Sequence, residues 1–270
     1  MTRRILDFLG ERSALGTFFV VGELVRQAPG LIREIAAAGH EIASHGFRHE
    51  PLTRQAPAAF RSELAESKAR LEDLAGRPVL GFRAPMFSLT PRSLWALEIL
   101  RDLGFRYSSS VLPAPWRTHG FAEAPTRPFL WANGLLEIPC PVGRIGPLTL
   151  PFLGGMYLRY LPPWRLRQLL RRVDDETLWT YCHPYDVDVE EAFHHLPGKS
   201  RLASFMLWCN RRVTLRRLDA LLRGQAVEPF AGRWSALHAA APVFQPARLP
   251  EWAVPGKVLP EPEPGASVAS

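Results

Sequence analysis

The stretch AAAGHEIASHGFRHEPL, residues 36–52, contains a complete transition from helix to strand to polar loop. Its alanines end at Gly39, a residue type that commonly terminates helices because it adopts left-handed backbone angles without strain. Residues 41–44 are predicted to form a short buried strand, and the polar residues that follow predict a loop. A helix that leads directly into a buried strand is the repeating unit of an α/β protein.

The same alternation of helices and short apolar strands continues on both sides of this stretch. The predicted helices cover residues 3–12, 24–38, 57–75, 90–104, 163–173 and 200–222. The predicted strands cover residues 17–21, 41–44, 76–82, 105–109, 135–139 and 177–183. This order predicts a parallel sheet, either open or closed into a barrel, with residues 111–134 forming a long loop at one rim.

The chain has 270 residues, of which 47% are hydrophobic, and this is enough for one large α/β domain or two small ones. We expect one domain over residues 1–228. From residue 229 onward the composition changes to Pro, Ala, Gly and Glu without periodicity, which predicts a tail, residues 229–270, that is disordered at its end.

The net charge of +7 comes mainly from arginines spread along the predicted helices. Such arginines usually form solvated helix faces. A basic surface can also attract an anionic polymer or a lipid headgroup, so the charge says little about partners. We predict no nucleic-acid partner. Three widely spaced cysteines form neither a disulfide framework nor a metal knuckle. The sequence has no apolar run of the roughly 18 residues needed to span a membrane and no signal-peptide pattern. We therefore predict a cytoplasmic protein, with cell-envelope association left open and no prediction of oligomeric state.

Polar side chains follow several of the predicted strands. His45 and His49 come after one strand, Arg83 after the next, and His183 after a much later one. Because the carboxyl ends of parallel strands meet at one rim, we expect these residues to converge there. Taken singly, each has an ordinary alternative: a surface histidine pair, a structural salt bridge and a buried core histidine. Two imidazoles four positions apart are also suitable ligands for zinc.

Six stretches of the sequence together resemble one known family. They are GTFFVVGE, AAAGHEIASHGFRHEPL, GFRAPMFSLTPRSLWAL, GFRYSSSV, GLLEIP and YCHPYDVD, and the resemblance that they carry extends over residues 1 to about 222. In this order and spacing they resemble the polysaccharide deacetylases of carbohydrate esterase family four, most closely the branch found with bacterial exopolysaccharide and exosortase loci. The resemblance implies a deformed (β/α) barrel that hydrolyses N-acetyl groups on an exopolysaccharide or a related N-acetylated glycan.

The resemblance also implies roles for individual residues. His45 and His49 would bind a divalent metal, usually zinc, and His183 would protonate the departing amine as general acid. Arg83, in an Arg-x-Pro motif, would orient the catalytic carboxylate. Three further residues, Tyr185, Asp186 and Pro85, are expected to contact the saccharide.

The sequence departs from the family at its first motif, a strand that ends in paired aspartates. Residues 1–19 match the first helix and second strand of the family, so the aspartate strand is expected before Met1, and the predicted barrel lacks its first strand. Ser108 also stands where this branch has aspartate. Three explanations remain open: an upstream coding segment, a truncated remnant, or a substitute carboxylate such as Asp186 or Glu50.

Loss of the paired aspartates would have two consequences. Two histidines hold zinc more weakly than the usual three protein ligands, and loss of a general base lowers the rate roughly 10²- to 10⁴-fold. Two other functions therefore remain open. One is a non-catalytic carbohydrate-binding protein on this fold, and the other is a metal-dependent hydrolase of small cyclic amides.

Overall fold

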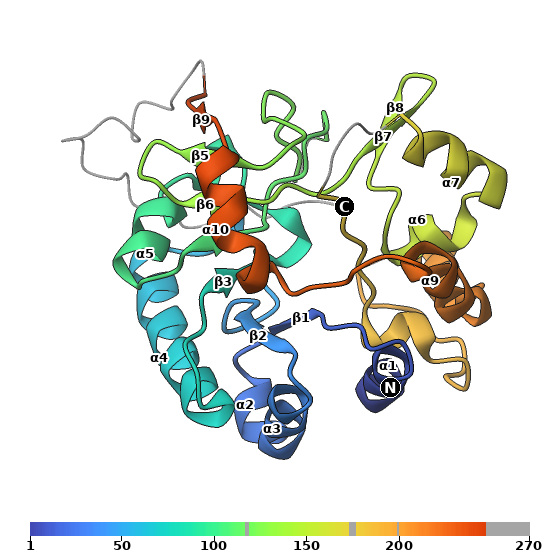
Figure 1. Ribbon diagram of the computed structural model, residues 1–270, viewed down its shortest axis with the longest axis horizontal. Coiled ribbons are helices and arrows are strands. Elements are labelled where there is room, and N and C mark those ends of the chain that lie inside the picture. The colour runs from blue at the N-terminus through green and yellow to red at the C-terminus, as the bar shows by residue number, and fades with distance from the viewer. Residues whose placement is uncertain (117–118, 173–176, 199, 247–270) are drawn as a thin grey trace.

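The computed structural model of the chain (Figure 1) describes residues 1–116, 119–172, 177–198 and 200–246. A largely parallel sheet forms its centre. The parallel strands are β1 (Thr17–Val20), β2 (Glu41–Ser44), β3 (Gly81–Phe82), β4 (Tyr107–Ser108) and β6 (Leu136–Glu137). Val20 lies opposite Ser44, and Ser44 opposite Phe82, so the loops after these strands leave the sheet at the same edge.

Helices connect β1 to β2, β2 to β3 and β3 to β4, as the alternating pattern predicts. They are α2 (Leu24–Gln27), α3 (Pro29–Ala37), α4 (Pro57–Ala75) and α5 (Ala96–Asp102). The longest, α4, has proline at its first position, where no backbone donor is needed, and ends at Gly76 with φ of +65°. It buries Phe60 and Leu64 against the sheet, where they join the largest apolar cluster of the protein.

The far side of the sheet contains two further strands. β5 (Phe129–Trp131) pairs antiparallel with β6, and β9 (Val243–Phe244) pairs parallel with β5. The prediction of an α/β fold on a parallel sheet is confirmed. Within the described residues the strand order is linear, β1-β2-β3-β4-β6-β5-β9, with β1 and β9 at its edges.

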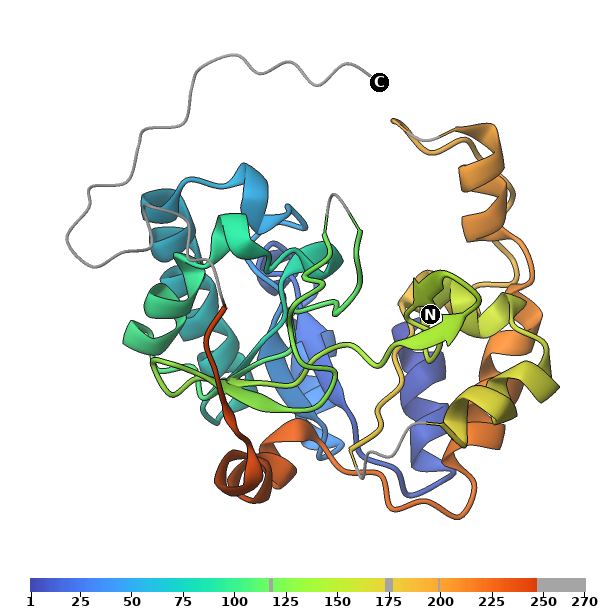
Figure 2. The same cartoon turned by 90° about the horizontal axis from the view of Figure 1, so that it is seen from above.

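A second group of elements, which we call the helical lobe, lies beside the β1 edge of the sheet (Figures 1 and 2). It contains α1 (Thr2–Gly10), α6 (Gly155–Tyr160), α7 (Pro163–Leu170), α8 (Arg201–Trp208), α9 (Thr214–Leu222) and the hairpin of β7 (Gly143–Ile145) and β8 (Leu148–Leu150). Phe8 of α1 packs there in an apolar cluster with Phe152 and Leu218. The first helix of the chain is therefore part of a unit built mainly from residues after 142. No helix in the described ranges is long and apolar enough to cross a membrane.

Several predicted elements are interrupted, each for a local reason. The helix predicted over 24–38 breaks at Ala28, because the residue before proline is excluded from helical angles and Pro29 follows. The helix predicted over 90–104 begins as a 3-10 turn, Pro91–Ser93, before α5. The helix predicted over 200–222 is divided at Asn210, whose φ is +62°.

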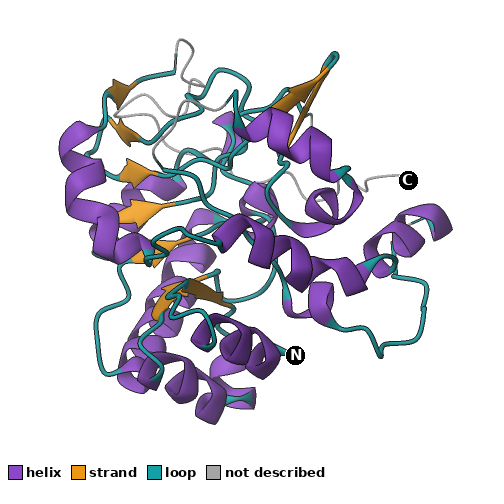
Figure 3. Cartoon of the chain, turned by 45° about the vertical axis from the view of Figure 1, so that its right-hand side comes forward, coloured by secondary structure: helices purple, strands orange, loops and turns teal. Residues whose placement is uncertain are grey.

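The strand predicted over 177–183 is wrong. This segment is extended but makes only one described bridge, between Gly154 and Tyr181. The ring of Tyr181 lies directly over Gly154, where a Cβ atom would be 2.1 Å from the ring. Tyr181 also exchanges backbone hydrogen bonds with Leu153 and Gly155, but the segment forms no strand ladder (Figure 3).

The structure also differs from the tail predicted to begin at residue 229. Residues 230–240 form α10 (Phe230–Ala240), which is followed by β9. Leu237 of α10 is buried with Tyr107 and Ile138, while Trp234 and Phe230 pack at the margin of that cluster. The domain therefore continues past residue 228, and the predicted disordered end lies outside the described residues.

Candidate active site

His45 and His49 lie in the loop that leaves β2, and the structure brings their rings together. The ring centroids are 5.1 Å apart with the planes at 65°. Gly46, with φ of +77°, allows the chain to turn directly after His45. His45 Nδ1 lies 2.7 Å from the carbonyl oxygen of Arg83, which can only accept, so Nδ1 carries the proton and Nε2 keeps its lone pair.

Both imidazoles favour the neutral state that binds metals. Burial, and after it the positive charges of His49, Arg83 and His183, together lower the pKa of His45 to about 3. Partial burial is also the main reason why the pKa of His49 is lowered, and the charge of His183 is the next. His183, which lies more than 130 residues away in the sequence, is thus among the charges that lower the pKa of both rings.

His183 is held by its own local turn, the 3-10 helix Pro184–Val187. One carboxylate oxygen of Asp186, Oδ2, accepts hydrogen bonds from the His183 backbone N at 2.8 Å and from Nδ1 at 2.9 Å. This arrangement fixes the His183 ring and leaves its Nε2 on the side away from Asp186. The ring of Tyr185 stacks on that of His183, with centroids 4.7 Å apart and planes at 7°.

Asp186 is itself fixed from the helical lobe. Arg159 Nη2 of α6 lies 3.3 Å from Asp186 Oδ1, and both side chains are fully buried. Arg159 also donates to the carbonyl oxygens of Cys209 and Leu207. Asp186 was expected to contact the saccharide, or to replace a missing metal ligand, but its burial and its two partners give it a different position. Asp186 instead fixes the His183 ring through its hydrogen bond with Nδ1.

Arg83 is buried in an aromatic slot. Its Cζ atom lies 4.0 Å from the ring centre of Phe19 and 4.2 Å from that of Trp179. Nε and Nη2 donate to the backbone and side-chain oxygens of Ser109. Burial lowers the Arg83 pKa to about 10, so the guanidinium remains charged at neutral pH. Among the described residues it has no ion pair with a carboxylate, so the expected role of orienting one has no partner here.

The other residues expected to contact saccharide differ in accessibility. Tyr185 is 39% exposed and available to a ligand. Pro85 is buried at the start of the 3-10 turn Pro85–Phe87. Its ring packs beside Gly46, so it supports the histidine loop from within.

The donor set suits a divalent metal in type and protonation state, because both imidazoles favour the neutral form and His45 keeps a free Nε2. It supplies two ligands. Within the described ranges no group of three His, Cys, Asp or Glu residues could hold a metal ion, and this includes the environment of Glu50. The site therefore combines two suitable ligands, a supported imidazole and a buried cation.

Sequence reasoning named Asp186 but gave it another role, and it did not name Arg159 or Ser109. The spacing of His183 and Asp186 is that of a helix cap and its third helical residue, and this was a signal that could have been used. Arg159 and Ser109 had no comparable signal, because each reaches the site from an element distant in sequence.

Comparison with known proteins is consistent with this geometry. Residues 1–108 match the family model described as polysaccharide deacetylase, and residues 109–232 match one described as a domain of unknown function, DUF3473. The first 108 residues of the chain are therefore similar to the polysaccharide deacetylases. The recognition made from the six sequence stretches is thereby confirmed at the level of the family.

Curated relatives of the chain are also named as deacetylases. A chitooligosaccharide deacetylase of Azorhizobium caulinodans is 31% identical over 118 residues, which are 43% of this chain and 55% of the relative. The peptidoglycan-N-acetylmuramic acid deacetylase PdaA of Bacillus subtilis is 28% identical over 101 residues, 37% of this chain and 36% of the relative. The chain thus spans about half or less of the length of these relatives.

A solved structure supports the fold assignment. It is a protein of Mycobacterium smegmatis described as a polysaccharide deacetylase, with a TM-score of 0.55 and 23% identity. The similarity covers 88% of this chain and 76% of that one, so the shared fold extends beyond the first 108 residues.

Proposed function

We propose that this polysaccharide deacetylase relative hydrolyses N-acetyl groups on a saccharide, with a divalent metal, zinc by preference, held by His45 and His49. The observation that supports this most directly is the pair of imidazole rings, with centroids 5.1 Å apart and His45 Nδ1 held by the carbonyl oxygen of Arg83. A pair of neutral metal ligands together with a separately supported imidazole supplies a Lewis acid site and a general acid, which are two of the groups that metal-assisted amide hydrolysis uses. As substrate we propose a bacterial exopolysaccharide or a related N-acetylated glycan.

The residues of this chain would act as follows. A divalent cation, when bound, supplies Lewis acidity toward the amide carbonyl and toward water. His183 protonates the departing amine through Nε2, while Asp186 accepts from Nδ1 and stabilises the charged imidazolium. The exposed ring of Tyr185 provides an apolar face for a sugar beside the reacting group.

The same site favours a second candidate, a saccharide-binding protein without turnover. The specific observation is that the described residues supply two metal ligands and leave Arg83 without a carboxylate partner. Two imidazoles bind zinc more weakly than three protein ligands do, and a site that works without a general base loses roughly 10²- to 10⁴-fold in rate. We therefore expect this chain to bind zinc weakly and to release acetate slowly or not at all.

Zinc titration by calorimetry on the purified chain tests the ligand assignment. We expect H49A to abolish zinc binding, whereas the matched control H195A, an exposed histidine outside the site, leaves it unchanged. Equal zinc affinity in H49A and in the unmodified chain would show that the ligand assignment is wrong.

Acetate release from a chitooligosaccharide in the presence of zinc separates the two candidates. Slow release that is lost in H183A, with zinc binding retained, supports the deacetylase. Saccharide binding with no acetate in any variant supports the binding protein. Rapid turnover would contradict the expected effect of the missing ligand and base.

A further inference from the structure

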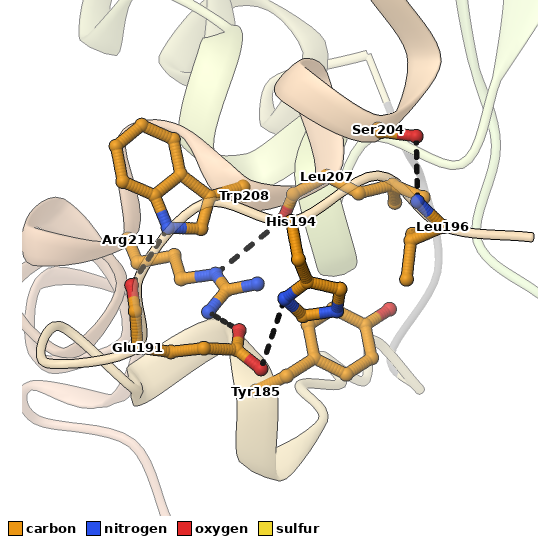
Figure 4. A pocket seen from close by; sticks show the side chains of 8 residues that line it. All are labelled: Tyr185, Glu191, His194, Leu196, Ser204, Leu207, Trp208 and Arg211. Carbon is orange, nitrogen blue, oxygen red and sulfur yellow. Dashed lines mark hydrogen bonds and ion pairs between the residues drawn. The ribbon is translucent and has the colours of Figure 1, made fainter. Parts of the chain in front are cut away.

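A pocket of about 250 Å³ lies beside the candidate active site, in the part of the chain between His183 and α9 (Figure 4). Tyr185 lines this pocket and also stacks on His183, so the pocket and the proposed general acid share one wall. Trp208, at the end of α8, provides a second aromatic side chain in the lining. The volume is below the roughly 300–1,000 Å³ of pockets for drug-sized ligands, which indicates a single ring as occupant.

The walls of the pocket are held in place by hydrogen bonds and an ion pair. Trp208 Nε1 donates to the backbone oxygen of Glu191 at 2.8 Å, which fixes the plane of the indole. The Glu191 carboxylate pairs with Arg211, whose side chain is only 8% exposed. The Arg211 guanidinium also lies 5.7 Å from the ring centre of Tyr185. The aromatic and polar groups are therefore fixed before any ligand arrives.

The charges in the pocket favour a neutral but hydrogen-bonding ligand. Glu191 and Arg211 neutralise each other, so an anion or a cation would gain little net attraction. A purely apolar ligand would remove water from both groups without replacing its hydrogen bonds. A sugar ring meets both demands, because its C–H faces stack on aromatic rings and its hydroxyls donate to Glu191 and accept from Arg211.

We propose that this pocket is a subsite for one neutral sugar ring of an oligosaccharide whose N-acetylated unit lies at His183. The inference rests on the proposed function and adds to it that the protein recognises a chain of sugars through residues of its C-terminal half. The shared wall of Tyr185 provides continuity between the two positions, since the same ring contacts His183 and lines the pocket.

Binding of N-acetylglucosamine and of its tetramer, measured by calorimetry with zinc present, tests the subsite. We expect the unmodified chain to prefer the tetramer, and W208A to weaken tetramer binding about tenfold, as for a buried aromatic anchor. W208F keeps an aromatic face and should restore most of the affinity. The matched control is W164A, which removes a tryptophan that is 61% exposed on α7 outside the pocket, and we expect it to bind the tetramer normally.

A second measurement needs no destabilising substitution. The indole N–H signal of Trp208, identified by its loss in W208F, should shift in NMR spectra as tetramer is added, while that of Trp164 stays in place. Tetramer binding that is unaffected by W208A, with an unshifted Trp208 signal, overturns the subsite and leaves the proposed function intact. No binding of either saccharide by the unmodified chain overturns both.

Discussion

At the scale of single residues, the burial of His45 makes the stability of the fold depend on pH. The unfolded chain binds a proton at His45 below about pH 6.5, whereas the folded chain does so only near pH 3. Between these values the unfolded state carries more protons, so stability falls as the pH falls. The slope due to this one residue is about 1.4 kcal/mol per pH unit.

We expect H45Q to flatten this dependence. Urea unfolding between pH 4 and pH 7 measures it, as the difference in slope between the unmodified chain and the variant. H195Q, which changes an exposed histidine, should keep the original slope. Parallel curves for the H45Q variant and the unmodified chain would contradict the burial of His45.

Asp186 is expected to be far more important for stability than an exposed carboxylate in an ion pair. D186N leaves the buried Arg159 charge without compensation, and such a loss costs about 3–5 kcal/mol. D102N removes a surface pair with Arg61, which is worth up to about 1 kcal/mol. Chemical unfolding of the two variants compares these values. A D186N variant as stable as D102N would show that the Arg159–Asp186 pair does not hold the site.

The residues of the site were predictable to different degrees. His45, His49 and His183 could be predicted as site residues because they lie in the family motifs and because they follow apolar segments of the chain. The support of His183 by Asp186 and Arg159 could not, since it depends on how η4 (Pro184–Val187) packs against α6. The burial of Arg83 between aromatic rings likewise depends on packing across elements.

At the scale of elements, prediction succeeded where local chemistry marked both ends. α4 has the predicted bounds because Pro57 and Gly76 limit it, and β2 has them because Gly39 and the polar loop enclose it. Prediction failed for residues 177–183, whose strand-like composition reflects packing of Tyr181 on Gly154. It also failed for α10, because alanine and glycine in residues 229–240 obscured the apolar positions that face the sheet.

The role of α10 can be measured by truncation. A chain ending at Glu228 would expose the apolar cluster of Tyr107, Leu136 and Ile138, and loss of the buried Leu237 alone costs about 2–5 kcal/mol. A chain ending at Pro246 keeps α10 and β9 and should unfold like the full chain. Thermal unfolding compares the two, and equal stability would mean that α10 does not contribute to the core.

At the scale of the whole molecule, α1 joins the beginning of the chain to the helical lobe. Arg4 Nη1 donates to the carbonyl oxygen of Val187, Arg12 Nε pairs with Asp219 at 2.9 Å, and Phe8 is buried in the lobe's apolar cluster. The imidazoles of the β2 loop and the supported His183 thus come from two units that α1 and the sheet hold together.

We expect F8A to destabilise the protein by about 3–5 kcal/mol, as for the loss of a buried phenylalanine. L202A, at a leucine that is 69% exposed, should change the free energy of unfolding by less than about 0.5 kcal/mol. Denaturant unfolding provides the comparison. Similar stabilities of F8A and L202A would show that α1 is not anchored in the lobe.

The two family models meet between Ser108 and Ser109, but this point is not a domain boundary in the structure. Ser108 ends β4, Ser109 accepts both hydrogen bonds of the Arg83 guanidinium, and Ser110 Oγ accepts from the backbone N of Ala84. A chimera that takes its first half from one relative and its second from another would have to preserve the hydrogen bonds between Arg83 and Ser109. We therefore expect a chimera joined at this point to be functional only when Arg83 and the serines that it contacts come from the same parent protein.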